Sequence, residues 1–160
     1  MQFIVLFTLS LGWIRLTQSL HQIAYCSVSV YHHTDAAIIS DILVEARAFN
    51  QKNDITGILL YKEDSYFQIL EAETQILERV IFKISKDPRH KRMMILYNVE
   101  INQRDFASWV MAFRAPMFTP ALIARMQDND FGSYINDPTQ LTHQVSRNAQ
   151  VMLTVFEENM

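Results

Sequence analysis

The chain has 160 residues, of which 49% are hydrophobic, so it can bury one good-sized core but has no room for two independent domains of ordinary size. Its 14 Lys and Arg are outnumbered by 17 Asp and Glu and form no basic stripe, which argues against direct contact with nucleic acid. Cys26 is the only cysteine, which excludes an internal disulfide and a thiolate metal cluster and fits a reducing, cytoplasmic location.

Residues 1–19 form an apolar extension whose composition differs from the rest of the chain. Its apolar run, from Phe3 to Ile14, is shorter than the about 20 residues that a membrane-spanning helix needs. No Lys or Arg precedes this run, so the charged start of a signal peptide is missing. We expect no membrane span. The sequence leaves open an interfacial or packing helix, a signal peptide, or a translation start drawn upstream of Leu20.

The region from His21 to Arg114 shows the order strand, helix, strand, strand, helix, strand, strand. The predicted strands are 21–29, 55–61, 65–71, 92–101 and 108–114, and the polar turn "KED" joins the second strand to the third. The first predicted helix is 35–50, capped by Thr34. The second is capped by Thr74 and ends at "DPRH". This order predicts an α+β, ferredoxin-like βαββαββ sheet. Right-handed crossovers would place both helices on the same face.

The tail, residues 116–160, is expected to be a helical extension packed on the other sheet face, which would otherwise be an exposed apolar patch. A short helix is predicted near 120–127. A longer one is predicted to begin with Asp137 as cap and Pro138 as first helical residue. One side of this longer helix would carry Leu141, Val145, Asn148, Met152 and Phe156.

Gln68 lies in the middle of the apolar strand "SYFQILE", where an unpaired amide would cost about 1 to 3 kcal/mol. Side chains alternate between the two faces of a strand. Gln68 therefore shares a face with Tyr66, Tyr25 shares one with Ser27, and Trp109 shares one with Met111. If these faces all point to the helices, Tyr25, Ser27, Gln68, Trp109 and Met111 converge between sheet and helices. Either a neighbouring side chain or a ligand then satisfies the Gln68 amide.

Four further polar residues belong to the same region of the predicted fold. Asn50 ends the first helix, Lys83 and Asp87 lie four residues apart near the end of the second, and His90 follows. Taken singly, each also fits an ordinary structural role, such as a helix-terminal Asn or a solvated ion pair. Together they surround an apolar slot of the kind that a flat ligand needs.

Five motifs carry a resemblance to a known family: "IAYCS", "FNQKNDITGILLY", "YFQILE", "KDPRH" and "WVMAF". On these motifs, residues 20–115 resemble the BLUF domain, the blue-light sensor using flavin. The likeness is greatest to the short members, in which this domain and two C-terminal helices make up the protein. Two departures stand out: "LEA" at 70–72 replaces the common "LEG", and Phe49 stands where many members have a polar residue.

The resemblance implies a non-covalent flavin between the two helices, usually FAD, with FMN or riboflavin as substitutes. It implies that Gln68 binds the ring near N5 and O4, that Tyr25 binds Gln68 and is the electron donor, and that Ile42 packs on the ring. It further implies contacts from Asn50 to the ring's carbonyl and imide edge, and from Lys83, Asp87 and His90 to the far edge and the ribityl side. No metal site is expected.

A light-driven rotation or tautomerisation of Gln68 would be the output of such a site, without turnover of a substrate, so we expect no enzyme activity. Asn and Gln suit a switch because the two ends of their amide are similar in shape and opposite in polarity. The signal would pass through Trp109 and Met111 to the tail. It would leave through a separate, unidentified partner protein at the tail helices or the exposed sheet edge; homo-oligomerisation is left open.

Two alternative functions remain at this level. A cofactor-free ferredoxin-like interaction module would share the fold, since the fold hosts many unrelated functions. A small flavoenzyme or acyl-transferring enzyme would need a nucleophile with its base or an open substrate cleft. The chain shows no Ser-His-Asp ordering and no Gly-rich phosphate loop among its 3 glycines, which disfavours the second alternative.

Overall fold

The computed structural model describes residues 19–32, 35–116, 135 and 145–159. The elements in chain order are β1 (Leu20–Ser29), α1 (Ala36–Lys52), β2 (Thr56–Lys62), β3 (Ser65–Glu73), α2 (Thr74–Ser85), β4 (His90–Glu100), β5 (Ala112–Arg114) and α5 (Arg147–Asn159). The short helix predicted near 120–127 and the predicted helix start at 137–144 lie outside the described residues.

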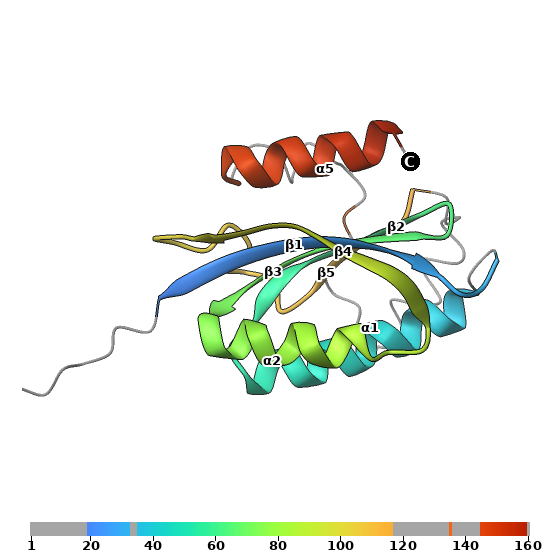
Figure 1. Cartoon of the computed structure of the whole chain (residues 1–160), viewed down its shortest axis with the longest axis horizontal. Helices are drawn as coiled ribbons and strands as arrows, with labels where there is room; N and C mark the ends of the chain where they lie inside the picture. The colour runs from blue at the N-terminus through green and yellow to red at the C-terminus, as the bar shows by residue number, and fades with distance from the viewer. Residues whose placement is uncertain (1–18, 33–34, 117–134, 136–144, 160) are drawn as a thin grey trace, which may run out of the picture.

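The five strands form one mixed sheet in the order β4-β1-β3-β2-β5. β1, β2, β3 and β4 pair in antiparallel fashion, and β5 adds to the edge of β2 as a parallel strand. Helices α1 and α2 lie on one face of the sheet and α5 lies on the other (Figure 1). The predicted α+β class, with two helices on one face, an added strand and a C-terminal helix, is confirmed.

Two apolar clusters hold these layers together, one on each face of the sheet. On the side of α1 and α2, Ile39, Leu43 and Leu77 pack on β1 and β3. On the side of α5, Phe156 packs on Phe67 with the ring centroids 5.3 Å apart. Burying a large apolar side chain contributes about 1.5 to 3 kcal/mol, so both faces of the sheet contribute to stability.

The turn between β2 and β3 has two residues, Glu63 and Asp64, between the paired Lys62 and Ser65. Both turn residues have positive φ, 47° and 63°. This is the backbone of the type I′ turn, whose twist matches that of the flanking strands. The Asp64 carboxylate accepts a hydrogen bond of 2.9 Å from the Tyr61 hydroxyl, which helps to hold the turn.

Both predicted helix caps are one residue away from the caps in the structure. The N-cap of α1 is Asp35, not Thr34, and its carboxylate accepts from the backbone nitrogen of Ala37 at 3.0 Å. Thr74 is the first residue of α2 and not its cap; Glu73 is the N-cap and makes no side-chain cap bond. The Thr74 hydroxyl can instead donate to the carbonyl oxygen of Ser19. Neighbouring polar residues compete for a cap position, which a sequence alone does not resolve.

The chain before β5 does not form the predicted strand. β5 is only Ala112–Arg114, whereas the predicted strand was 108–114. Trp109 ends a turn in which its backbone nitrogen donates a hydrogen bond of 2.9 Å to the backbone oxygen of Phe106. Trp109 packs against the cluster on the α5 side, whereas Met111 belongs to the cluster on the helix side. The prediction that Trp109 joins Met111 beside Tyr25 is therefore wrong, because alternation applies only within a strand.

The last helix also differs from its prediction. Val145 and Ser146, predicted as helical, precede α5, which begins at Arg147. Its buried residues are Ala149, Leu153 and Phe156; the predicted Asn148 is exposed and Met152 is partly buried. The most buried positions are thus displaced by one residue from the predicted ones, although Phe156 is common to both and the predicted Val145 and Met152 also pack against the cluster.

Among the described residues, no helix combines the length and apolar character needed to cross a bilayer.

A buried carboxylate ties the chain before β5 to the sheet. Glu71 has no exposed surface. It accepts hydrogen bonds from Gln22 Nε2 at 2.8 Å, from Thr56 Oγ1 at 2.9 Å, and from the backbone nitrogens of Asp105 and Phe106 at 2.7 and 3.0 Å. A buried charge is tolerated only when its hydrogen bonds are made, and Glu71 meets that condition with donors from several segments.

Gly57 allows the close approach of β2 and β3. A Cβ atom at this position would lie 2.1 Å from the carbonyl oxygen of Ile69, which is backbone and cannot move without breaking the sheet. We expect Gly57→Ala to lower the free energy of unfolding by about 1 to 3 kcal/mol, more than the small gain from a stiffer unfolded chain. Urea unfolding followed by circular dichroism measures this, and equal stability of the variant and the parent would contradict it.

Candidate functional site

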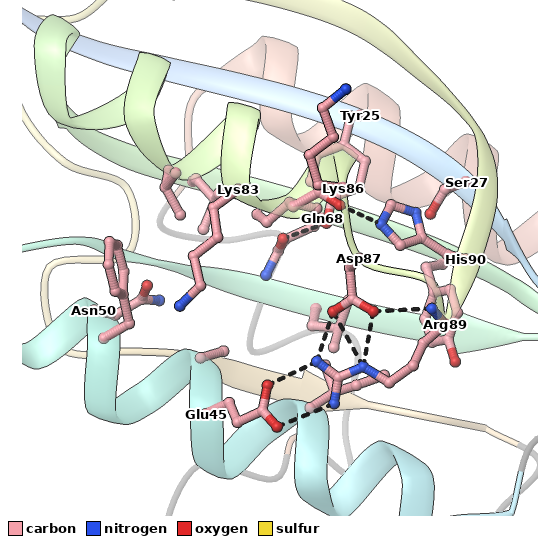
Figure 2. A pocket seen from close by; sticks show the side chains of 18 of the residues that line it. Tyr25, Ser27, Glu45, Asn50, Gln68, Lys83, Lys86, Asp87, Arg89 and His90 are labelled. Atoms are coloured by element: carbon pink, nitrogen blue, oxygen red, sulfur yellow. Dashed lines mark hydrogen bonds and ion pairs between the residues drawn. The ribbon is translucent and has the colours of Figure 1, made fainter.

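A cavity of about 390 Å³ lies between α1, α2 and the sheet (Figure 2). This volume falls in the range of about 300 to 1,000 Å³ that small-molecule sites occupy. Eight of the predicted site residues line it: Tyr25, Ser27, Ile42, Asn50, Gln68, Lys83, Asp87 and His90. Ile42, Leu59 and Val80 are among its apolar walls, so the cavity combines apolar surfaces with a few polar groups.

The Tyr25 hydroxyl donates to Gln68 Oε1 at 2.6 Å. β1 and β3 pair so that these two residues are directly opposite each other, and both side chains are buried. Burial raises the pKa of the Tyr25 phenol, and the nearby Asp87 carboxylate and Tyr66 raise it further. The phenol therefore keeps its proton well into the alkaline range and remains a hydrogen-bond donor.

The nitrogen end of the Gln68 amide is held much less strongly. Nε2 donates to the thioether sulfur of Met111 at 3.3 Å, and a thioether is only a weak acceptor. Met111 itself is buried and lies just before β5. Gln68 thus has one strong contact, on its oxygen, and one weak contact, on its nitrogen. Met111 lies at the site as predicted, but Trp109 does not.

Asn50 lies near the C-terminal end of α1. Its backbone oxygen accepts from the nitrogens of Asn53 and Ile55, which closes the helix, and its side chain is 2% exposed. The side-chain nitrogen donates to the carbonyl oxygen of Val110 at 2.9 Å. Asn50 therefore links α1 to the segment that carries Met111, while its side chain borders the cavity.

An ion-pair cluster at the rim joins α1 to the turn after α2 (Figure 2). Arg89 donates to Asp87 with Nη2 at 2.6 Å and Nε at 2.9 Å, and to Glu45 with Nη2 at 2.7 Å. The hydrogen bond from Arg89 lowers the pKa of the Asp87 carboxyl, and the bond to Asp87 raises the pKa of the Arg89 guanidinium. Both groups are charged at neutral pH, so this side of the cavity has a fixed, paired charge.

Arg89 and Glu45 are cavity residues that the sequence did not predict. Their contact joins two positions far apart in the chain, and no local spacing indicates it. The one available signal was a basic residue two positions after Asp87, in "DPRH". Lys83, which was predicted, has its ammonium 4.4 Å from the centroid of the Phe49 ring, a cation–π contact at the cavity wall.

Three buried polar atoms lack a hydrogen-bond partner in the part of the chain that the structure describes: Ser27 Oγ, the Tyr66 hydroxyl and His90 Nδ1. All three residues line the cavity. His90 Nε2 lies 2.7 Å from the carbonyl oxygen of Ile84, so Nε2 carries the proton and Nδ1 is an acceptor in the neutral ring. Such atoms cost about 1 to 3 kcal/mol each when unpaired. A ligand with hydrogen-bonding groups in the cavity would provide the missing partners.

The chain matches the family model "BLUF: Sensors of blue-light using FAD" over residues 20–112. Among curated proteins it is 30% identical over 105 residues to photoactivated adenylate cyclase subunit alpha of Euglena gracilis, covering 65% of this chain and 10% of that protein. It is 33% identical over 58 residues to the blue light- and temperature-regulated antirepressor BluF of Escherichia coli K12, covering 36% of this chain and 14% of that protein. The chain thus spans only a small part of these relatives.

Two solved structures of similar length have the same fold. The ground state of BlsA is 27% identical with a TM-score of 0.61, covering 88% of this chain and 89% of that one. The dark state of BlrB, described as a BLUF protein, is 23% identical with a TM-score of 0.62, covering 86% of this chain and 97% of that one. With a family model that covers more than half of the chain, this protein belongs to the BLUF family, the sensors of blue light using FAD.

Proposed function

We propose that this blue-light sensor holds a non-covalent flavin, FAD with FMN or riboflavin as substitutes, and that light reverses a hydrogen bond at Tyr25 and Gln68 to change the binding of a separate partner protein. The observation that carries the proposal is the bond of 2.6 Å between these two side chains at the wall of a cavity of about 390 Å³. Residues 20–115 would form the sensor, and residues 116–160 would transmit its state.

The residues of the cavity suit the groups of a flavin. Gln68 and Asn50 offer amides to the polar edge of the ring system, and Ile42 offers an apolar surface to its face. Lys83, Asp87 and His90 would contact the far edge and the ribityl side. The unpaired atoms of Ser27, Tyr66 and His90 are further donors and acceptors for the same ligand.

When bound, a flavin supplies a chromophore for blue light whose excited state is a strong oxidant. Tyr25 is the phenol best placed to give up an electron, because its proton has an immediate acceptor in Gln68 Oε1. Its raised pKa keeps that proton in place in the dark. Return of the electron and the proton restores the phenol, so the cycle consumes no substrate.

The amide of Gln68 would be the element that stores the result. Rotation or tautomerisation of the amide exchanges the group that faces the Tyr25 hydroxyl. The exchange replaces the bond that Tyr25 donates to Gln68 Oε1 by one that Nε2 donates to the phenol oxygen, and the contact of Nε2 with the Met111 sulfur that it removes is weak, so the two arrangements can be close in free energy. A new hydrogen bond from the amide to the ring would shift its absorption to the red.

The contacts on the far side of Gln68 support a route to the tail. Met111 precedes β5, whose last residue, Arg114, donates through Nε to the carboxylate of Glu157 in α5. Lys62 Nζ donates to the backbone oxygen of Glu157 at 2.6 Å. A movement of Met111 would thus reach α5 through β5, with Trp109 packed on the same side as α5. The partner protein would read this change at α5 or at an exposed edge of the sheet.

The first experiment is an absorption spectrum of the purified protein, reconstituted with FAD, in the dark, under blue light and after return to darkness. We expect a flavin spectrum that shifts reversibly to the red. Bleaching in place of a shift would contradict the hydrogen-bond switch. Failure to bind FAD, FMN or riboflavin would contradict flavin sensing and favour the cofactor-free module.

Tyr25→Phe should leave flavin bound and remove the light-induced red shift, because the variant lacks the phenol proton and the electron donor. Absorption difference spectra measure this. The matched control is Tyr66→Phe, which removes a hydroxyl from the same cavity that has no partner in the described part of the protein. At matched flavin occupancy the control should retain the shift, because Gln68 Oε1 keeps its bond from Tyr25. A full shift in Tyr25→Phe would refute the assigned donor.

Gln68→Leu should also remove the red shift, since it replaces the amide by an apolar side chain of similar size. The same change leaves the Tyr25 hydroxyl without its acceptor, so unfolding experiments should show a loss of about 1 to 3 kcal/mol. Difference spectra at matched flavin occupancy test the first expectation. A shift of unchanged size would show that another group performs the switch.

A further inference from the structure

The three residues before β5 are held by their backbone carbonyl oxygens. The Trp109 oxygen accepts from a backbone nitrogen of β2 at 3.1 Å. The Val110 oxygen accepts from Asn50 Nδ2 at 2.9 Å. The Met111 oxygen accepts from two nitrogens of Arg47, Nε at 3.1 Å and Nη2 at 2.9 Å. Each of these three carbonyls thus has a donor in another element of the fold.

Helix α1 provides the donors for the last two carbonyls. Arg47 and Asn50 lie three residues apart on α1 and therefore on the same side of the helix. A hydrogen bond from a charged guanidinium is stronger than one from a neutral amide. Two nitrogens of one planar group also fix the direction of the carbonyl that they bind. The strongest attachment of this segment is therefore the one at Met111.

Met111 depends on this attachment because it lies outside the regular pairing of the sheet. The register of β2 with β5 begins at Ala112, one residue later. The Met111 side chain is buried, and its sulfur accepts from Gln68 Nε2 at 3.3 Å. The carbonyl that Arg47 holds and the sulfur that Gln68 contacts belong to the same residue. Fixing the carbonyl therefore fixes the point from which the thioether reaches Gln68.

We propose that Arg47 is a positioning residue for the light switch, which keeps the Met111 sulfur at Gln68 Nε2 and so favours the dark orientation of the amide. This inference rests on the proposed function. Among the described residues, Arg47 is not part of the cavity lining, so it acts through Met111 and not on the ligand. Light turns Nε2 away from the sulfur, and the return to darkness re-forms a contact that Arg47 has prepared.

Arg47→Leu should slow dark recovery of the red-shifted state by about threefold or more, because the sulfur is less often in place when the contact re-forms. Flavin affinity and the size of the shift should be retained. Arg47→Lys should recover at an intermediate rate, since it keeps a cationic donor without the planar, two-nitrogen geometry. The matched control is Arg79→Leu, an exposed arginine of α2, which should recover as the parent does.

A double-variant cycle separates positioning of Met111 from a general loosening of the fold. In a Met111→Leu background, Arg47→Leu should change the recovery rate by less than about 1.5-fold, because the sulfur that Arg47 places is gone. A general loosening would slow recovery equally in both backgrounds. Circular dichroism establishes that each variant is folded, and Arg47→Lys carries the same cycle if Arg47→Leu does not fold.

A second measurement needs no flavin and no light. In the flavin-free protein labelled with methyl-¹³C methionine, Met111→Leu identifies the signal of Met111. Arg47→Leu should move that signal, Arg47→Lys should move it less, and Arg79→Leu should leave it unchanged.

The outcomes separate this inference from the proposed function. A parent without a reversible red shift would overturn the proposed function, and this inference with it. In a parent that shifts, an Arg47→Leu variant with parental recovery, an equal effect in the Met111→Leu background, or an unmoved Met111 signal would overturn the role of Arg47 alone.

Discussion

The hydrogen bond between Tyr25 and Gln68 depends on the order and register of the sheet. The two residues come from β1 and β3, separated by a whole helix and a hairpin, and they meet because these strands pair with Tyr25 directly opposite Gln68. A slip of one residue would turn one of the two side chains toward α5. The hydrogen bond from Gln22 to Glu71, which lie opposite each other on the same two strands, helps to fix this register and therefore also the site.

The cavity combines rigid and weakly held polar groups. Asp87 and Arg89 are locked together with Glu45, and Asn50 is fixed by the end of α1 and by Val110. The nitrogen of Gln68, in contrast, has only a sulfur acceptor. Most of the polar wall is thus held by strong hydrogen bonds, while one amide nitrogen has only a weak partner. That difference suits the proposed switch, in which one group changes within a fixed frame.

The features that followed from the sequence were those set by local periodicity. The amphipathic patterns of α1 and α2, the hairpin, and the placement of Tyr25 and Gln68 on one face all depend on spacing within an element. The prediction for Trp109 was wrong because the chain forms a turn there, so the strand alternation used to place it does not apply. The most buried positions of α5 are displaced because Ala149 and Leu153 are buried, whereas Asn148 is exposed and Met152 only partly buried. Either set fits a helical period, and only tertiary packing selects between them.

Such local patterns do not predict contacts between segments that are far apart in the sequence. The pair of Arg89 and Glu45 joins the turn after α2 to the middle of α1. Arg89 has a local partner in Asp87, but no local spacing links Arg89 to Glu45, and both are ordinary surface types. Their position at the cavity emerges only when α1 and α2 lie side by side on the sheet (Figure 1).

The buried carboxylate of Glu71 has a consequence for how sequences of this kind can diverge. Its partners come from three separate segments, represented by Gln22, Thr56 and Asp105. Loss of one donor leaves a buried charge short of a hydrogen bond, which costs more than the loss of a surface contact. The backbone donors at Asp105 and Phe106 remain whatever side chains stand there, so the constraint falls on Gln22 and Thr56, which donate from their side chains. Related proteins that replace Glu71 should replace these two residues as well, so the three positions would change as a group over evolution.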